Sequence, residues 1–110
     1  MSHYTVYDFS ESLSREGIER EDIKRVVAAF GGPVEWDGWS GGFLMEMKSG
    51  QFVYLTGWCD YTGWGCQDGA SKTEYDACPK LEDLKAEYEW DEAPADLNRY
   101  VETGEGRFDS

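Results

Sequence analysis

Residues 42–56 decide the fold of this chain, and they read GFLMEMKSGQFVYLT. Two β-prone runs flank Ser49 and Gly50, and a Ser-Gly pair between such runs is typical of a β-hairpin. A two-residue turn pairs Lys48 with Gln51 and thereby sets the register of the whole hairpin.

In that register one face of the hairpin is strongly apolar and the other is mixed. The other face pairs Leu44 with Leu55 and Glu46 with Val53. An apolar face of this kind needs a covering layer, and a helix is the expected cover. The pairs predicted on the apolar face are Met47 with Phe52, Met45 with Tyr54 and Phe43 with Thr56.

Before the hairpin, the sequence predicts a strand, a helix and a second strand. Residues 4–9 (YTVYDF) are β-prone. The helix ends at residues 31–33 (GGP), because glycine suits the position after a helix and proline cannot continue one. Residues 34–39 are the second strand, joined to the hairpin by a turn at 40–42. The helix is predicted from an apolar stripe of Ile18, Ile23, Val26, Val27 and Phe30.

After the hairpin, the sequence predicts a short strand at 72–77, a helix at 80–90 and a last short helix from residue 93 that ends before Gly104. The stripe of the helix at 80–90 is Leu81, Leu84 and Tyr88. The expected fold is α+β, an antiparallel sheet of three to five strands with N-terminal and C-terminal helices packed on one face. We expect one compact domain at 1–103 and a flexible acidic tail at 104–110.

Charge restricts the class of partner. The 110 residues include 23 acidic and 10 basic side chains, for a net charge of −13. Such a chain is repelled by phosphate backbones and anionic lipids, which argues against direct nucleic-acid or membrane binding. Hydrophobic residues make up 40% and aromatic residues 15%, so the chain is a folded domain and not a disordered acidic segment. Basic protein surfaces, cations and neutral ligands remain as classes of partner. An alternative interpretation is that the acidity serves solubility alone.

The acidity is concentrated in residues 71–110, which hold a net charge of −7. On helices, carboxylates three or four residues apart form a ladder, here Glu82, Glu89, Glu92 and Asp96. We therefore predict a non-catalytic module that occupies a basic groove of a nucleic-acid-processing protein by mimicking nucleic acid. The predicted electrostatic contacts are Glu82, Asp83, Glu87, Glu89, Asp91, Glu92 and Asp96.

Residues 56–68 (TGWCDYTGWGCQD) repeat a Thr-Gly-Trp unit six residues apart. The aromatic residues Trp58, Tyr61 and Trp64 could anchor a protein partner. In an alternative function they form a stacking ledge for a sugar, a base or a cationic ligand. A structural alternative is a glycine-rich turn whose indoles cap the core.

The three cysteines, Cys59, Cys66 and Cys78, are spaced C-x6-C-x11-C and lack the tight knuckle of structural zinc sites. We predict no metal and no cofactor. Alternatives are a Cys59–Cys66 disulfide and a zinc site completed by His3, Asp60 or Asp68. No signal peptide is visible at the N-terminus, so we expect a cytoplasmic chain with reduced thiols.

Catalysis has little support in the sequence. The chain has one histidine, and it contains no P-loop, G-x-G-x-x-G or H-E-x-x-H motif. The acids around the cysteines raise a thiol pKa instead of lowering it. We predict that the chain is not an enzyme, with a small enzyme using a Cys or carboxylate centre as a further alternative. The oligomeric state stays open.

Residues 52–67 (FVYLTGWCDYTGWGCQ) resemble a segment of small, uncharacterised acidic proteins of bacteriophages and prophages. The resemblance covers about residues 42–70 and brings no established activity. It implies a source class in which small acidic proteins often inhibit host machinery, including anti-CRISPR and anti-restriction proteins. The implied location is the cytoplasm of the bacterial host.

Overall fold

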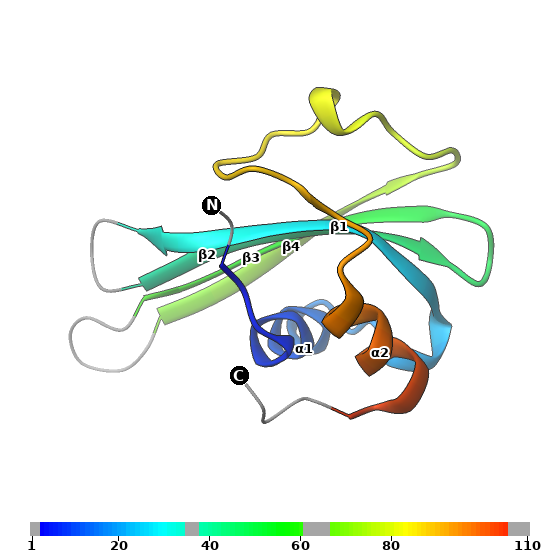
Figure 1. The fold of residues 1–110 in the computed structure, drawn as a ribbon, viewed down its shortest axis with the longest axis horizontal. Helices are drawn as coiled ribbons and strands as arrows, with labels where there is room; N and C mark the ends of the chain where they lie inside the picture. The colour runs from blue at the N-terminus through cyan, green and yellow to red at the C-terminus, as the bar shows by residue number, and fades with distance from the viewer. Residues whose placement is uncertain (1–2, 35–37, 61–66, 106–110) are drawn as a thin grey trace.

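The computed structural model describes residues 3–34, 38–60 and 67–105. One 5-stranded antiparallel sheet has the strand order β4-β3-β2-β1-β5, and both helices lie on the same side of it (Figure 1). This confirms the predicted α+β class with helices from both ends on one face. The elements are α1 (Val6–Arg15), β1 (Ile23–Val34), β2 (Gly38–Met47), β3 (Phe52–Asp60), β4 (Gln67–Tyr75), β5 (Asp91–Glu92) and α2 (Ala95–Thr103), with 3-10 turns at Arg20–Asp22 and Leu81–Asp83.

We call the side of the sheet that carries α1 and α2 the helix face and the opposite side the outer face. The division into a domain at 1–103 and a tail at 104–110 stays a prediction, since residues 106–110 lie outside the described part of the chain.

The N-terminal segment is helix α1, where the sequence predicted a strand. Thr5 caps the helix: its hydroxyl accepts from the backbone N–H of Asp8 at 3.0 Å, and the Asp8 carboxylate accepts from the N–H of Thr5 at 3.0 Å. This capping box satisfies two free N–H groups of the first turn. Val6, Phe9 and Leu13 then share one buried face. The capping pattern therefore overrides the β-propensity of residues 4–9.

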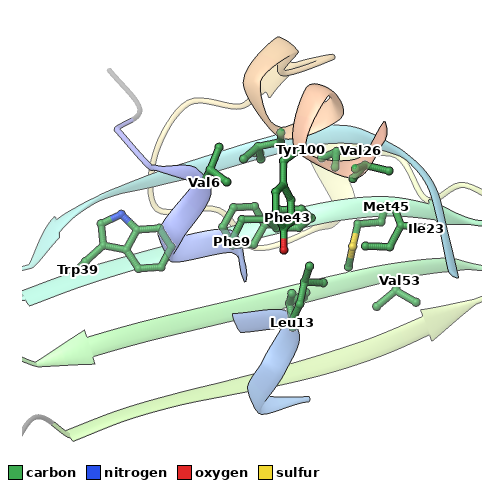
Figure 2. Close-up of a cluster of buried hydrophobic side chains, with 14 residues drawn as sticks. Val6, Phe9, Leu13, Ile23, Val26, Trp39, Phe43, Met45, Val53 and Tyr100 are labelled. Atoms are coloured by element: carbon green, nitrogen blue, oxygen red, sulfur yellow. The ribbon is translucent and has the colours of Figure 1, made fainter. Parts of the chain in front are cut away.

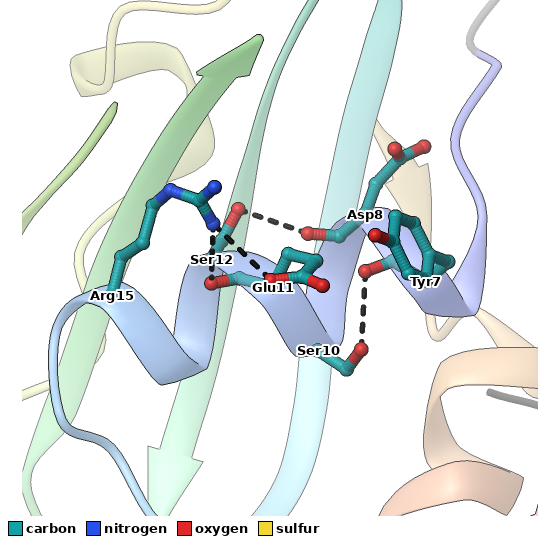
Figure 3. Close-up of polar contacts among 6 residues, drawn as sticks. All are labelled: Tyr7, Asp8, Ser10, Glu11, Ser12 and Arg15. Carbon is teal, nitrogen blue, oxygen red and sulfur yellow. Dashed lines mark hydrogen bonds and ion pairs between the residues drawn. The ribbon is translucent and has the colours of Figure 1, made fainter. Parts of the chain in front are cut away.

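Hydrogen bonds also satisfy the polar side of α1 (Figure 3). The hydroxyl of Ser12 donates to the carbonyl of Asp8 at 2.9 Å, and Arg15 forms an ion pair with Glu11 at 3.3 Å. Ser12 lies against Gly57 of β3, where an added Cβ would collide with its hydroxyl. The glycine thus allows α1 to approach the sheet closely.

Strand β1 replaces the helix predicted from the stripe that begins at Ile18. Its register against β2 shifts twice, once between Ile23 and Arg25 and once between Val26 and Ala28. Each shift is a β-bulge that adds one residue to β1. Helix-face residues therefore recur every three positions through this stretch, which imitates the spacing of a helical stripe.

The hairpin at Ser49 and Gly50 is confirmed, but its register differs from the prediction by one residue. Met45 faces Val53 instead of Tyr54, and Phe43 faces Leu55 instead of Thr56. The turn holds three residues: the N–H of Gly50 donates to the carbonyl of Met47 at 2.9 Å, and the φ angle of Gly50 is 95°. A type I turn followed by a left-handed glycine is the common three-residue hairpin loop.

Residues 40–42 lie inside β2 and form no turn. The indole of Trp39 occupies the space that a Cβ on Gly41 would need, and the ring of Phe30 does the same at Gly42. These glycines therefore allow aromatic rings to lie flat on the sheet. Strand β4 ends at Tyr75 and begins earlier than the strand predicted at 72–77.

The main core lies between the helix face and the two helices (Figure 2). The rings of Phe9 and Phe43 are 4.9 Å apart at its centre, and Tyr100 of α2 packs edge-on against Phe9 at 6.1 Å. Asn98 of α2 fixes that helix to β1: its amide accepts from the N–H of Val26 at 2.8 Å and donates to the carbonyl of the same residue at 3.0 Å. The predicted C-terminal helix is confirmed and ends at Gly104 in the left-handed conformation.

Candidate functional site

The connection from β4 to α2, residues 76–94, crosses the outer face, and we call it the strap (Figure 1). Residues 84–91 (LKAEYEWD) alternate strictly between half-buried and exposed positions. A period of two is typical of extended chain. The helix predicted at 80–90 is therefore wrong, and only a 3-10 turn at 81–83 is helical. The apolar-charged alternation was the sequence signal for this segment.

Aromatic side chains hold the strap on the sheet. Trp90 packs edge-on against Phe30 with ring centroids 4.9 Å apart and lies 6.0 Å from Tyr54. The ring of Tyr88 covers Gly32, leaving no room there for a Cβ. These contacts give the outer face a second, smaller apolar layer, which the sequence prediction missed.

Two tyrosine hydroxyls fix the strap to specific carbonyl groups. Tyr54 donates to the carbonyl of Lys85, and Tyr88 donates to the carbonyl of Pro33. Burial, together with the nearby Tyr75 and Glu87, raises the pKa of Tyr54 to about 12. The phenol of Tyr54 therefore stays protonated, and remains a hydrogen-bond donor, to a higher pH than an ordinary tyrosine.

The C-terminal end of the strap joins the sheet edge as β5. The N–H of Ala93 donates to the carbonyl of Val27 at 2.8 Å, so a bulge residue of β1 pairs with the strap. The hydroxyl of Tyr4 donates to the carboxylate of Asp91. Burial, with Asp91 and then Asp96 as further causes, strongly raises the pKa of Tyr4. Both carboxylates therefore disfavour ionisation of the Tyr4 phenol at this edge.

The structure corrects the predicted carboxylate ladder, because its members do not share one helix. Two of the seven acids lie in the 3-10 turn, two in the extended part of the strap, two in β5 and one in the first turn of α2. All seven are exposed, as predicted for partner contacts. They are Glu82, Asp83, Glu87, Glu89, Asp91, Glu92 and Asp96.

Instead of a ladder, the strap presents a row of alternate side chains. Lys85, Glu87, Glu89 and Asp91 are the successive exposed positions, and extended chain separates such positions by about 6.6 Å. Asp91 pairs with the helix-face residue Ala29, so Glu87 and Glu89 are the carboxylates of this row on the outer face. No ion pair reaches Glu82, Glu87 or Glu92 from the described part of the chain. Lys24 and Arg25 both pair with Glu46, whereas the strap carries two exposed cations of its own, Lys80 and Lys85.

Trp58 is the one of the three predicted aromatic residues whose side chain the structure describes. It lies on the outer face of β3, between Ser40 of β2 and Gly69 of β4, and is 48% exposed. The indole lies over Gly69, where an added Cβ would be 2.7 Å from the indole nitrogen. Trp58 therefore does not cap the core. Tyr61 and Trp64 lie outside the described residues.

The cysteines are described only in part. Cys59 is half-buried and Cys78 is exposed, whereas Cys66 lies outside the described residues. Within the described part, no group of three or more His, Cys, Asp or Glu side chains is arranged to hold a metal ion. No helix among the described residues is long and apolar enough to cross a membrane.

Comparisons with protein-family models, with curated proteins and with solved structures gave no match. The resemblance of residues 42–70 to small acidic phage proteins therefore stays a prediction. The candidate site rests on the geometry of the outer face alone, which carries an acidic strap fixed by aromatic residues and, on the same face, an exposed indole.

Proposed function

We propose that this chain is a non-catalytic protein-binding module that uses its outer face to occupy a basic, nucleic-acid-binding surface of a host protein. The observation that carries the proposal is the set of exposed carboxylates on the strap, of which Glu82, Glu87 and Glu92 form no ion pair with the described part of the chain. The phage-type inhibitor class follows from the sequence resemblance and belongs to the same proposal.

The row of carboxylates supports mimicry of a nucleic-acid backbone. Phosphates follow one another by about 3.4 Å along the axis of each strand of a duplex. Carboxylates about 6.6 Å apart therefore match about every second phosphate step. A groove lined with Lys and Arg responds mainly to the field, so this spacing is sufficient for steering and rapid association.

Trp58 supplies the apolar part of the same surface. Its row on the outer face continues through Ser40 to Gly32, which lies under Tyr88 of the strap. An exposed indole on the same face as the strap carboxylates can receive the planar guanidinium of Arg, which stacks on aromatic rings and forms bidentate hydrogen bonds with carboxylates. The outer face thus favours an Arg-rich surface over a Lys-rich one.

The test compares two variants that lose the same charge at different places. The strap variant carries Glu82→Gln, Asp83→Asn, Glu87→Gln and Glu92→Gln. The control carries Glu16→Gln, Glu19→Gln, Asp22→Asn and Glu102→Gln, four acids outside the strap. Each protein is immobilised and exposed to a bacterial lysate, and retained proteins are eluted with salt or with double-stranded DNA.

We expect the original chain and the control to retain basic, DNA-binding proteins that salt and DNA both release. The strap variant should retain far less of them. Equal losses in the two variants would assign the capture to net charge alone and contradict a site on the strap. Retained proteins that DNA fails to release would contradict nucleic-acid mimicry.

A second candidate function is the binding of a small ligand at Trp58, favoured by the polar platform around it. Thr56 and Ser71 lie on the same face, with their hydroxyl oxygens 2.7 Å apart. Rings of sugars stack on exposed indoles beside such hydroxyls. If this function holds, monosaccharides added to the chain change its tryptophan fluorescence, Trp58→Ala abolishes that change, and the strap variant leaves it intact.

A further inference from the structure

Among the described strands, β4 leaves an open edge on the sheet. It is the terminal strand of the order β4-β3-β2-β1-β5, and all 9 of its residues pair with β3 without a register shift. The opposite edge is blunted, because β5 has only 2 residues. Natural edge strands are commonly protected by bulges, prolines, short length or charged side chains; β4 lacks the first three, and its charges include Lys72 and Glu74.

The charges on this edge are complementary to the charges on the same edge of a second, antiparallel copy. Lys72 and Glu74 both lie on the helix face, since they pair in register with the buried residues Leu55 and Val53. Their side chains are 38% and 52% exposed and form an ion pair of 3.7 Å. A second β4 that runs antiparallel would meet one positive and one negative side chain, in the reverse order.

Symmetry restricts how two copies can pair along this edge. Antiparallel pairing places directly opposite residues on the same face of the sheet, so a two-fold axis must pass through a single residue position. An axis at Lys72 sets two lysines against each other, and an axis at Glu74 sets two glutamates against each other. An axis at Thr73 sets Lys72 opposite Glu74 of the partner subunit, twice over.

We propose that the chain forms a dimer by antiparallel pairing of β4 with β4 of a second copy, centred on Thr73. On the outer face, Thr73 meets Thr73 of the partner subunit, and Ser71 meets Tyr75 of the partner subunit. Opposite charges and Thr–Thr contacts at facing positions both stabilise antiparallel pairs. The result is one continuous sheet made of two 5-stranded sheets.

This dimer has a consequence for the outer face. The two-fold axis is perpendicular to the sheet, so the outer faces of both copies lie on the same side. Two acidic straps and two Trp58 side chains would then face one partner. The dimer itself does not depend on the proposed function, because it rests on the charges and register of β4.

The test uses two charge reversals, Lys72→Glu and Glu74→Lys, measured by sedimentation equilibrium. The first gives an edge with only acids at these positions, and the second gives an edge with only lysines. Arg99→Glu and Glu19→Lys are the controls, because they change net charge equally at exposed positions away from β4. Circular dichroism checks that each variant is folded.

We expect a dimer for the original chain and both controls. Each reversal alone should weaken dimerisation at least about ten-fold, because two attractive pairs become repulsive. An equimolar mixture of the two reversed proteins should form a heterodimer, since each lysine again meets a glutamate. A monomeric original chain, reversals that dimerise like the original, or a mixture that stays monomeric would each overturn the proposal.

Discussion

The two faces of the sheet are closed in different ways. On the helix face, α1 and α2 bury Phe9, Phe43 and Leu55 completely. On the outer face, the strap covers the sheet with half-buried aromatic residues such as Tyr88 and Trp90, and it leaves Trp58 exposed. Stability is therefore concentrated on the helix face, and the groups available to a partner are concentrated on the outer face.

This difference shows that the strap has two roles, and that different residues perform them. Its inward side chains attach it to the sheet, whereas its outward carboxylates are exposed to solvent and contribute little to folding. Substitutions of the outward acids should change binding while the free energy of unfolding stays nearly constant. Substitutions of the inward aromatics should change both.

Phe43→Ala should have the largest effect on stability. Phe43 is 0% exposed and contacts the rings of Tyr4, Phe9 and Trp39. Removing a fully buried ring leaves a cavity and lowers the free energy of unfolding by about 3–5 kcal/mol. Urea denaturation followed by far-UV circular dichroism measures the change. A loss below about 1 kcal/mol would contradict the placement of the main core on the helix face.

Trp90→Ala should have an intermediate effect that is centred on the strap. Its ring joins Phe30 and Tyr54 beneath the strap, but it is only half-buried. We expect a loss of about 1–3 kcal/mol and faster proteolytic cleavage within residues 76–94. Trp58→Ala is the matched control, because an exposed indole should change stability by no more than about 0.5 kcal/mol. Equal losses in the two variants would contradict the difference between an anchoring and an exposed indole.

Tyr54→Phe should have the smallest effect on stability. This effect should favour the variant only at high pH. An unfolded tyrosine ionises near its ordinary pKa of 10.0, whereas burial raises the folded pKa of Tyr54 to about 12. Its contribution to stability is thus complete below pH 10 and is lost as the pH rises from about 10 to about 12. Because phenylalanine cannot ionise, the melting temperature of the variant should fall less steeply over this range. Parallel curves would argue that Tyr54 ionises normally.

The fold class could be predicted from the sequence because it depends on overall composition and on the hairpin signal. Errors in the assignment of single elements do not change either of these. The hairpin at Ser49 and Gly50 and the helix ending at Gly104 were both predicted and are both present. The helix predicted from Ile18 onward failed because two bulges in β1 give apolar residues a three-residue spacing. Bulges depend on the neighbouring strand, so the local pattern alone does not distinguish them from a helical stripe.

The candidate site was predicted in composition but not in geometry. The acids after residue 80 are exposed as expected, yet they lie on an extended strap and not on a helix. Residues 81–91 contain both an i, i+3, i+7 stripe (Leu81, Leu84 and Tyr88) and, from residue 84, a strict alternation, and the sequence alone does not choose between them. Tertiary packing decides, because Tyr88 and Trp90 can cover Gly32 and Phe30 together only when they are two residues apart on one side of an extended chain.

The most direct test of the central claim, that the outer face binds Arg-rich protein surfaces, is a nuclear magnetic resonance titration of the labelled chain with a short arginine-rich peptide. A glycine-serine peptide of equal length is the control. We predict that the arginine-rich peptide shifts the indole N–H of Trp58 and the backbone amides of residues 85–92, while the amides of α1 stay unchanged. Shifts that gather on α1 and α2, or that the control peptide reproduces, would contradict the account.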